Sequence, residues 1–107
     1  MTVNVPLLIN GEFIESKSQE TLNVLNPATQ SVLAVVPLAT NEEVEQAVAG
    51  AKAAYLKWRD VPVTERARLM LRYQHLLKEH QQEIAEILAE DTGKNIEDAM
   101  GDVWRGI

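Results

Sequence analysis

The spacing of hydrophobic residues along the chain changes near residue 40. Before that point, short apolar runs are separated by turn-forming residues, a pattern typical of β-strands joined by tight turns. The pair Asn10-Gly11 lies between two such runs, and both residue types suit the positive φ angles of a hairpin turn. We therefore expect one β-hairpin over residues 7–15 and a second over residues 21–36, whose loop is residues 26–31.

After residue 40, apolar residues recur at the period of an α-helix, and no later segment has the pattern of a strand. Thr40 and Glu43 stand at the spacing of a capping box, in which each side chain satisfies a backbone N–H of the other residue. An alanine-rich stripe then continues to about Arg59, which predicts a first helix that packs closely against a neighbour.

The helical pattern continues through the second half of the chain. Thr64 can cap a second helix after a break at residues 60–63, Gly93 suits the end of a shorter third helix, and Asn95 can cap a fourth. The pattern thus predicts two β-hairpins followed by about four α-helices. The fourth helix is still in register at Ile107, from which we expect the chain to be a truncated piece of a longer protein.

Composition narrows the class of protein. The 107 residues are 46% apolar and carry 10 basic against 16 acidic side chains, a net charge of −6. Such a chain can fill a core, whereas its acidic balance argues against nucleic acid and anionic membranes as partners. The chain has no cysteine and no leader-like opening, so we expect no disulfide or thiolate chemistry here and a cytoplasmic location.

Two histidines stand at spacings that are found in metal sites. His75 with Glu79, and His80 with Glu83, stand at spacings that put an imidazole beside a carboxylate on one helix face. Such pairs can bind a metal ion, but a solvated helix face has the same composition. We therefore expect no metal.

The common motifs of catalysis and dinucleotide binding are missing from the sequence. It contains no G-x-G-x-x-G and no nucleophile elbow, and Thr92-Gly93-Lys94 lacks the first glycine and the leading strand of a phosphate loop. We expect no catalytic residue and no cofactor-binding residue in this chain.

The last segment is the most informative. Gly101 and Gly106 lie inside the fourth predicted helix, where each glycine costs about 1 kcal/mol relative to alanine. Such a cost is offset where another backbone or a ligand approaches closely, and the guanidinium of Arg105, between the two glycines, suits a carboxylate. The alternative is that Asp102 and Arg105 form an i,i+3 surface pair worth a few tenths of a kcal/mol.

Six short segments together resemble the aldehyde dehydrogenases over nearly the whole chain, and the last resembles the CoA-acylating branch that acts on methylmalonate or malonate semialdehyde. The segments are Ile9-Asn10-Gly11-Glu12, Asn26-Pro27-Ala28-Thr29, the alanine-rich helix ending in Trp58, Arg66, Thr92-Gly93-Lys94 and residues 101–106.

The resemblance implies an α/β parent with a doubly wound sheet, in which residues 1–107 are the truncated N-terminal portion of the NAD-binding domain. It also implies oxidation of the semialdehyde with NAD and CoA, through a cysteine and a general base outside this chain, to propionyl-CoA or acetyl-CoA, NADH and carbon dioxide. Arg105 is the residue that it relates to the substrate carboxylate. Asp102 and the backbone of Leu25 fall near positions that hold a structural monovalent cation in some members of the family. Homodimers or homotetramers are usual in the family.

Two other functions stay open at this point. One is an aldehyde dehydrogenase of different substrate specificity, and the other is a non-catalytic acidic helical module that binds a partner protein through its amphipathic faces. The 107-residue chain alone is expected to be inactive as an enzyme, since the cysteine and the base lie outside it.

Overall fold

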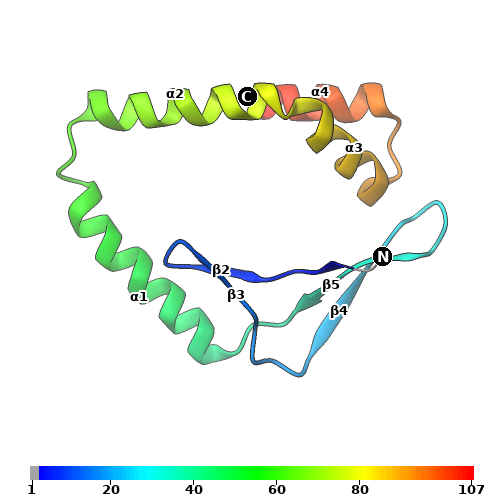
Figure 1. Cartoon of the computed structure of the whole chain (residues 1–107), viewed down its shortest axis with the longest axis horizontal. Helices are drawn as coiled ribbons and strands as arrows, with labels where there is room; N and C mark the ends of the chain where they lie inside the picture. The colour runs from blue at the N-terminus through cyan, green and yellow to red at the C-terminus, as the bar shows by residue number, and fades with distance from the viewer. Residues whose placement is uncertain (1–2) are drawn as a thin grey trace. The chain divides into compact units, whose positions relative to one another are not determined.

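The computed structural model describes residues 3–107, in which five strands are followed by four helices (Figure 1). The chain divides into two compact units. The first consists of the chain up to Val24 together with Val32–Val61, and the second of Leu25–Ser31 together with Pro62–Ile107. The expected order of hairpins before helices is confirmed.

The first unit begins with the predicted hairpin. Strands β2 (Leu7–Ile9) and β3 (Glu12–Ile14) pair antiparallel. The turn between them has φ of 55° at Asn10 and 82° at Gly11. Both values are positive, as the Asn-Gly pair predicted, and they match the right-handed twist of the flanking strands.

The second sheet has three strands in the order β1-β5-β4. Strands β4 (Thr21–Leu25) and β5 (Val32–Pro37) are the predicted second pair, and β5 includes the proline that ends it. Strand β1 (Val3–Asn4) was not predicted, and it runs parallel to β5 with Val3 opposite Ala34. Two residues are too few to show the alternation by which strands are recognised in a sequence.

Helix α1 (Asn41–Trp58) begins at the predicted capping box. The Thr40 hydroxyl accepts the Glu43 backbone N–H at 3.3 Å, and the Glu43 carboxylate accepts the Thr40 backbone N–H at 2.8 Å. The helix packs against β2 within the first unit, as Figure 1 shows. Ile9 at the end of β2 is buried there.

In the second unit, α2 (Val63–Glu79) corrects one expectation. The helix is not capped by Thr64, because it begins one residue before it, and Pro62 is the N-cap without a side-chain hydrogen bond. The Pro62 carbonyl instead accepts the backbone N–H groups of Glu65 and Arg66 at 3.0 and 3.1 Å. A proline ring that holds φ near −52° prepares this start without a polar side chain.

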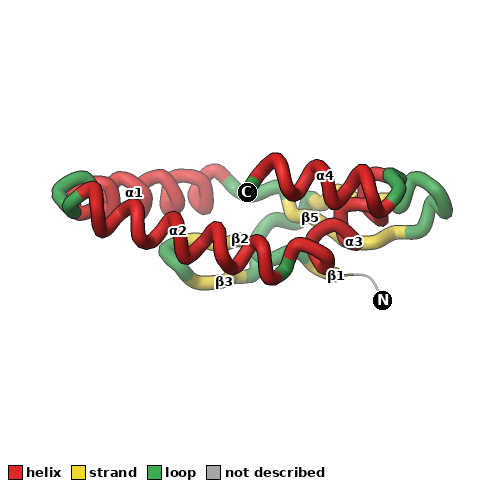
Figure 2. Tube along the Cα trace, turned by 90° about the horizontal axis from the view of Figure 1, so that it is seen from above, coloured by secondary structure: helices red, strands yellow, loops and turns green. Residues whose placement is uncertain are grey.

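Helices α3 (Gln81–Thr92) and α4 (Ile96–Gly106) form the tightest contact of the second unit. Ala85 on α3 and Ala99 on α4 are fully buried. The connection between the helices, a green loop in Figure 2, ends α3 at Gly93 and begins α4 at Asn95, as predicted. Among residues 3–107, no helix combines the length and apolarity that crossing a bilayer requires.

Candidate functional site

The carboxylate of Asp102 on α4 joins two cationic side chains. Its Oδ1 atom accepts a hydrogen bond from Nη2 of Arg105, and its Oδ2 atom accepts one from Nζ of Lys94. The Asp102 side chain is 23% exposed, whereas that of Arg105 is 72% exposed. A partly buried carboxylate thus anchors a guanidinium that faces solvent.

The local sequence explains why Lys94 reaches this carboxylate. Gly93 ends α3 in the left-handed region with φ of 74°, and Asn95 begins α4 by accepting the Asp98 backbone N–H at 2.9 Å. Lys94 is the residue between these two caps. We did not predict its role, and the available signal was its position just before an N-cap and eight residues before Asp102.

The cluster of Lys94, Asp102 and Arg105 carries two positive charges and one negative charge. One cation is therefore left without a matching carboxylate in the cluster. Arg105 has five N–H donors in a planar fork, and the bond to Asp102 uses only part of them. Chemically, the cluster is suited to hold one further carboxylate at the surface of α4.

The two helical glycines beside Arg105 are not crowded by the described residues. A Cβ atom on Gly101 would lie 3.7 Å from Nη1 of Arg105, an ordinary contact, and one on Gly106 would meet nothing within 4 Å. The predicted close approach of another backbone or a ligand thus has no counterpart inside residues 3–107, and it stays a prediction.

Two of the sequence segments that resemble the aldehyde dehydrogenases, residues 26–29 and 92–94, lie in contact in the second unit. A Cβ atom on Gly93 would lie 3.0 Å from Cγ of Pro27, so the loop at residues 25–31 packs on the end of α3. That loop is held by its own hydrogen bonds, because Oδ1 of Asn26 accepts the backbone N–H of Ala28 at 2.9 Å. The contact supports the connection from which Lys94 extends.

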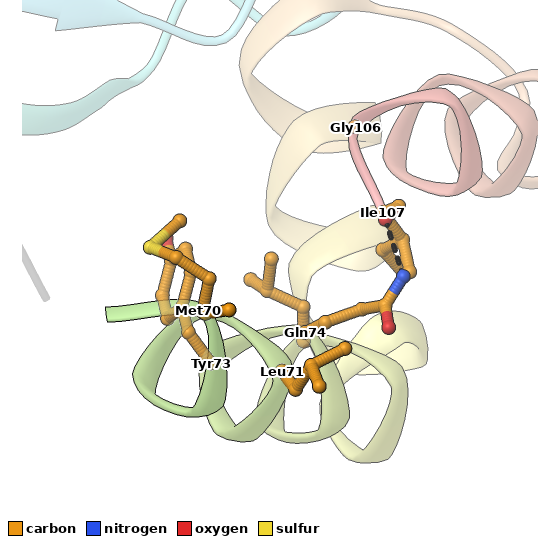
Figure 3. Close-up of a pocket in the computed structure, with 8 residues that line it drawn as sticks. Met70, Leu71, Tyr73, Gln74, Gly106 and Ile107 are labelled. Atoms are coloured by element: carbon orange, nitrogen blue, oxygen red, sulfur yellow. Dashed lines mark hydrogen bonds between the residues drawn. The ribbon is translucent and has the colours of Figure 1, made fainter. Parts of the chain in front are cut away.

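A groove of about 440 Å³ lies between α2 and the end of α4 (Figure 3). Met70, Leu71 and Tyr73 line it from α2, and Ile107 lines it from the other side. A hydrogen bond crosses it, in which Nε2 of Gln74 donates to the carbonyl oxygen of Ile107 at 2.8 Å. A site for a small polar substrate needs several convergent polar groups, so this groove is better suited to packing.

Arg66 on α2 has a buried guanidinium nitrogen. Its Nε atom has no hydrogen-bond acceptor among residues 3–107. A buried donor without a partner is costly. This residue was one of the marks of the resemblance, and no further role was predicted for it.

The histidines form the surface pairs that the spacing indicated. His75 lies 3.5 Å from Glu79, His80 lies 2.9 Å from Glu83, and all four side chains are exposed. Within the described part of the chain, no three acidic or histidine side chains gather as a metal-ligand set.

A second polar cluster, in the first unit, surrounds Glu43. The Glu43 carboxylate accepts the backbone N–H of Lys17 at 2.7 Å and the hydroxyl of Ser16 at 2.8 Å, besides its bond to Thr40. The hydrogen bond from the Lys17 backbone, followed by that from the Thr40 backbone, lowers the pKa of Glu43 below its usual value of 4.5. These partners belong to the segment after β3 and to the N-cap of α1, so we interpret the cluster as structural.

Comparison with known proteins shows which of these features belong to a family. The profile of the family described as "Aldehyde dehydrogenase family" matches residues 13–107. The match therefore includes both helices and the loop that form the cluster around Asp102.

Individual relatives agree with the family match. The chain is 48% identical over 99 residues to malonate-semialdehyde dehydrogenase 1 of Geobacillus kaustophilus, covering 92% of this chain and 20% of the relative. It is 44% identical over 107 residues to the acylating mitochondrial methylmalonate-semialdehyde dehydrogenase of Arabidopsis thaliana, covering all of this chain and 18% of the relative. The chain thus spans no more than a fifth of the length of these relatives.

Solved structures show the same likeness in three dimensions. A protein from Sinorhizobium meliloti 1021, assigned as a methylmalonate-semialdehyde dehydrogenase and solved with NAD, superposes with a TM-score of 0.94 at 37% identity. The superposition covers 99% of this chain and 22% of that one.

Proposed function

This chain belongs to the aldehyde dehydrogenase family, and we propose that it is the N-terminal part of an enzyme that oxidises methylmalonate or malonate semialdehyde. The proposed reaction consumes NAD and CoA and yields propionyl-CoA or acetyl-CoA, NADH and carbon dioxide. The observation that carries the proposal is the 44–48% identity, over almost all of this chain, to relatives named for these two semialdehydes.

Within that enzyme, we assign residues 1–107 to the N-terminal portion of the cofactor-binding domain. The described residues do not fit a dinucleotide site, because no strand among residues 3–107 leads through a glycine-rich turn into a helix in the way such a site requires. We infer that the site for NAD, the nucleophile and the general base lie in the remainder of the enzyme, as the resemblance implies. The 107-residue chain alone is expected to be inactive.

The contribution of this chain to the reaction is recognition of the substrate. A semialdehyde of the malonate type carries a carboxylate close to its aldehyde carbon, so a group that holds the carboxylate also limits the positions of the carbonyl. The exposed guanidinium of Arg105 has free donors and lies in a cluster with one unmatched positive charge. We assign to Arg105 the contact with that carboxylate.

The test is a comparison of two substrates in the complete enzyme. Arg105→Ala is expected to raise KM for malonate semialdehyde by about tenfold or more, since a charge-assisted hydrogen bond is lost. KM for an uncharged aldehyde of similar length should change by less than about twofold, because that aldehyde offers no carboxylate. Arg72→Ala, which removes an exposed arginine from α2, is the matched control and should leave both values unchanged.

Two outcomes would contradict the proposal. If Arg105→Ala changes KM equally for both aldehydes, the carboxylate contact is wrong. If the parent enzyme does not turn over malonate or methylmalonate semialdehyde at all, the substrate assignment is wrong. A cytoplasmic location and a homodimeric or homotetrameric assembly stay predictions, which cell fractionation and sedimentation of the complete enzyme test.

A further inference from the structure

The exposure of the two partners in the Asp102–Arg105 pair is unequal. Asp102 is partly buried, and its second oxygen is held by Lys94 from the α3–α4 connection. A surface pair between two mobile side chains would have neither property. Asp102 is thus a fixed point, and Arg105 is a solvent-facing group attached to it.

We propose that Asp102 is a positioning residue for substrate recognition, which acts by holding the guanidinium of Arg105 ready for the substrate carboxylate. The proposal rests on the proposed function, because it assumes that Arg105 meets a carboxylate. It assigns a specificity role to a residue that does not itself touch the substrate.

The gain from such positioning is entropic. A free arginine side chain samples many rotamers, and binding a ligand requires that it be immobilised in one of them. The hydrogen bond from Nη2 of Arg105 to Oδ1 of Asp102 imposes much of that restriction before the substrate arrives. The remaining N–H groups of the fork stay available for a second carboxylate.

A carboxylate placed beside the substrate carboxylate would ordinarily repel it. Lys94 removes this difficulty, because its ammonium group is bound to the other oxygen of Asp102 and offsets the negative charge. The cluster as a whole stays positive by one charge. Lys94 and Asp102 therefore act together: Lys94 offsets the negative charge of Asp102, and Asp102 restrains the position of the Arg105 guanidinium.

A positioning role and a purely electrostatic role of Asp102 predict opposite changes of KM for the semialdehyde in the Asp102→Asn variant. Asp102→Asn removes a negative charge from the neighbourhood of Arg105, so electrostatics alone would tighten binding of the semialdehyde and lower its KM. If Asp102 acts by positioning, the same substitution raises that KM, because the neutral amide oxygen of asparagine holds the guanidinium more weakly than a carboxylate does. We expect a rise of about three- to tenfold, the cost of immobilising one long side chain.

The experiment measures steady-state kinetics of the complete enzyme with malonate semialdehyde and with an uncharged aldehyde. Asp102→Asn should raise KM for the semialdehyde only, with kcat and the thermal midpoint within the range of the control. Glu97→Gln is the matched control, because it removes one exposed acidic charge from the first turn of the same helix. In an Arg105→Ala background, Asp102→Asn should have no further effect on KM for the semialdehyde.

Asp102→Glu tests the proposal independently if the asparagine variant does not fold. It keeps the charge of the cluster but displaces the carboxylate by one methylene, so we expect KM for the semialdehyde to lie between those of the wild type and Asp102→Asn. Where only the glutamate variant folds, a KM for the semialdehyde at least about twofold above wild type is expected.

The proposal is overturned if Asp102→Asn lowers KM for the semialdehyde or leaves it unchanged, if it affects both aldehydes alike, or if it acts equally in the Arg105→Ala background. It is also overturned if Asp102→Glu, the only folded variant, leaves that KM at the wild-type value. These outcomes leave the proposed function intact so long as Arg105→Ala alone discriminates between the two aldehydes. If Arg105→Ala changes KM equally for the two aldehydes, the substrate contact assigned to Arg105 under the proposed function is itself wrong.

Discussion

The carboxylate of Glu43 and the backbone nitrogen of Lys17, which are 26 residues apart in the chain, lie 2.7 Å from each other. This bond ties the first turn of α1 to the segment that follows β3. Glu43 was predicted as one half of a capping box, and its local role is confirmed. Its bonds to Lys17 and Ser16 give it a second role, in which it fixes the entry of α1 against the strand region of the first unit.

Glu43 should make the stability of the protein depend on acid pH. Because hydrogen bonds lower its pKa in the folded state, the ionised form stabilises the fold at pH above the ordinary value of 4.5. That contribution is lost as the pH falls through the lowered pKa. Urea unfolding should show wild type more stable than Glu43→Gln at pH 7, with a difference that shrinks below pH 4.5.

Glu42→Gln is the control for this experiment, since it removes the same charge from the same turn and breaks none of these hydrogen bonds. It should change the unfolding midpoint far less. Equal pH profiles for the two variants would show that the bonds to Lys17 and Thr40 contribute nothing. Thr40→Ala, which removes the other half of the box, should cost about 1 kcal/mol at all of these pH values.

Gly50 on α1 lies directly against the side chain of Asn10 in the hairpin turn. A Cβ atom at this position would collide with Oδ1 of Asn10 and lie 2.8 Å from its Cγ. Gly50→Ala should therefore destabilise the protein by about 1 kcal/mol or more, although alanine is the better helix former. Thermal unfolding measures this cost.

Combining Gly50→Ala with Asn10→Gly separates the effect of the collision from the effect of helix propensity. Asn10→Gly keeps a residue that accepts the positive φ of the turn and removes the colliding amide. In that background, Gly50→Ala should stabilise the protein by about 0.5–1 kcal/mol. If Gly50→Ala has the same effect in both backgrounds, the contact with Asn10 is unimportant.

A side chain at Gly93 should destabilise the protein for two separate reasons. Its φ of 74° is unfavourable for alanine, and a Cβ atom would press on Pro27 at 3.0 Å. Gly93→Ala should cost about 1–2 kcal/mol, measured by urea unfolding. Adding Pro27→Ala to the Gly93→Ala variant should restore only the part of the lost stability that is due to the collision. Full restoration would show that the backbone conformation at residue 93 is not strained.

The 107-residue chain by itself should associate. Leu71 is 62% exposed, and it lines the groove of Figure 3 together with Met70 and Tyr73. Apolar surface of this kind binds other apolar surface when nothing covers it. Sedimentation of the 107-residue chain should show concentration-dependent association, which Leu71→Gln weakens. A stable monomer at all concentrations would favour the independent interaction module instead.

Local features of the fold could be read from the sequence because each depends on a few adjacent residues. The positive φ angles at Asn10 and Gly11, the capping box at Thr40, and the stop at Gly93 all follow from side-chain size or a short-range hydrogen bond. The start of α2 was predicted wrongly at Thr64, because Pro62, with its fixed φ, begins the helix without a polar side-chain cap.

The candidate site could be predicted only in part. Arg105 and its spacing to Asp102 were visible in the sequence, but the burial of Asp102 and its bond to Lys94 were not. An i,i+3 spacing indicates that two side chains can meet on a helix, but not which of them is enclosed. Lys94 belongs to a different element, so its contact depends on the path of the α3–α4 connection.

The sequence by itself determined where the first hairpin turns, where α1 and α4 begin, where α3 ends and, through its resemblance, the family to which the chain belongs. Only the tertiary structure decided that Asn10 meets Gly50, that Pro27 lies against Gly93, and that β1 pairs with β5. The physical reason is the distance along the sequence over which each kind of interaction acts. Turns and caps are set by steric and hydrogen-bonding preferences within a few residues, whereas these contacts join segments whose meeting depends on packing of the whole unit.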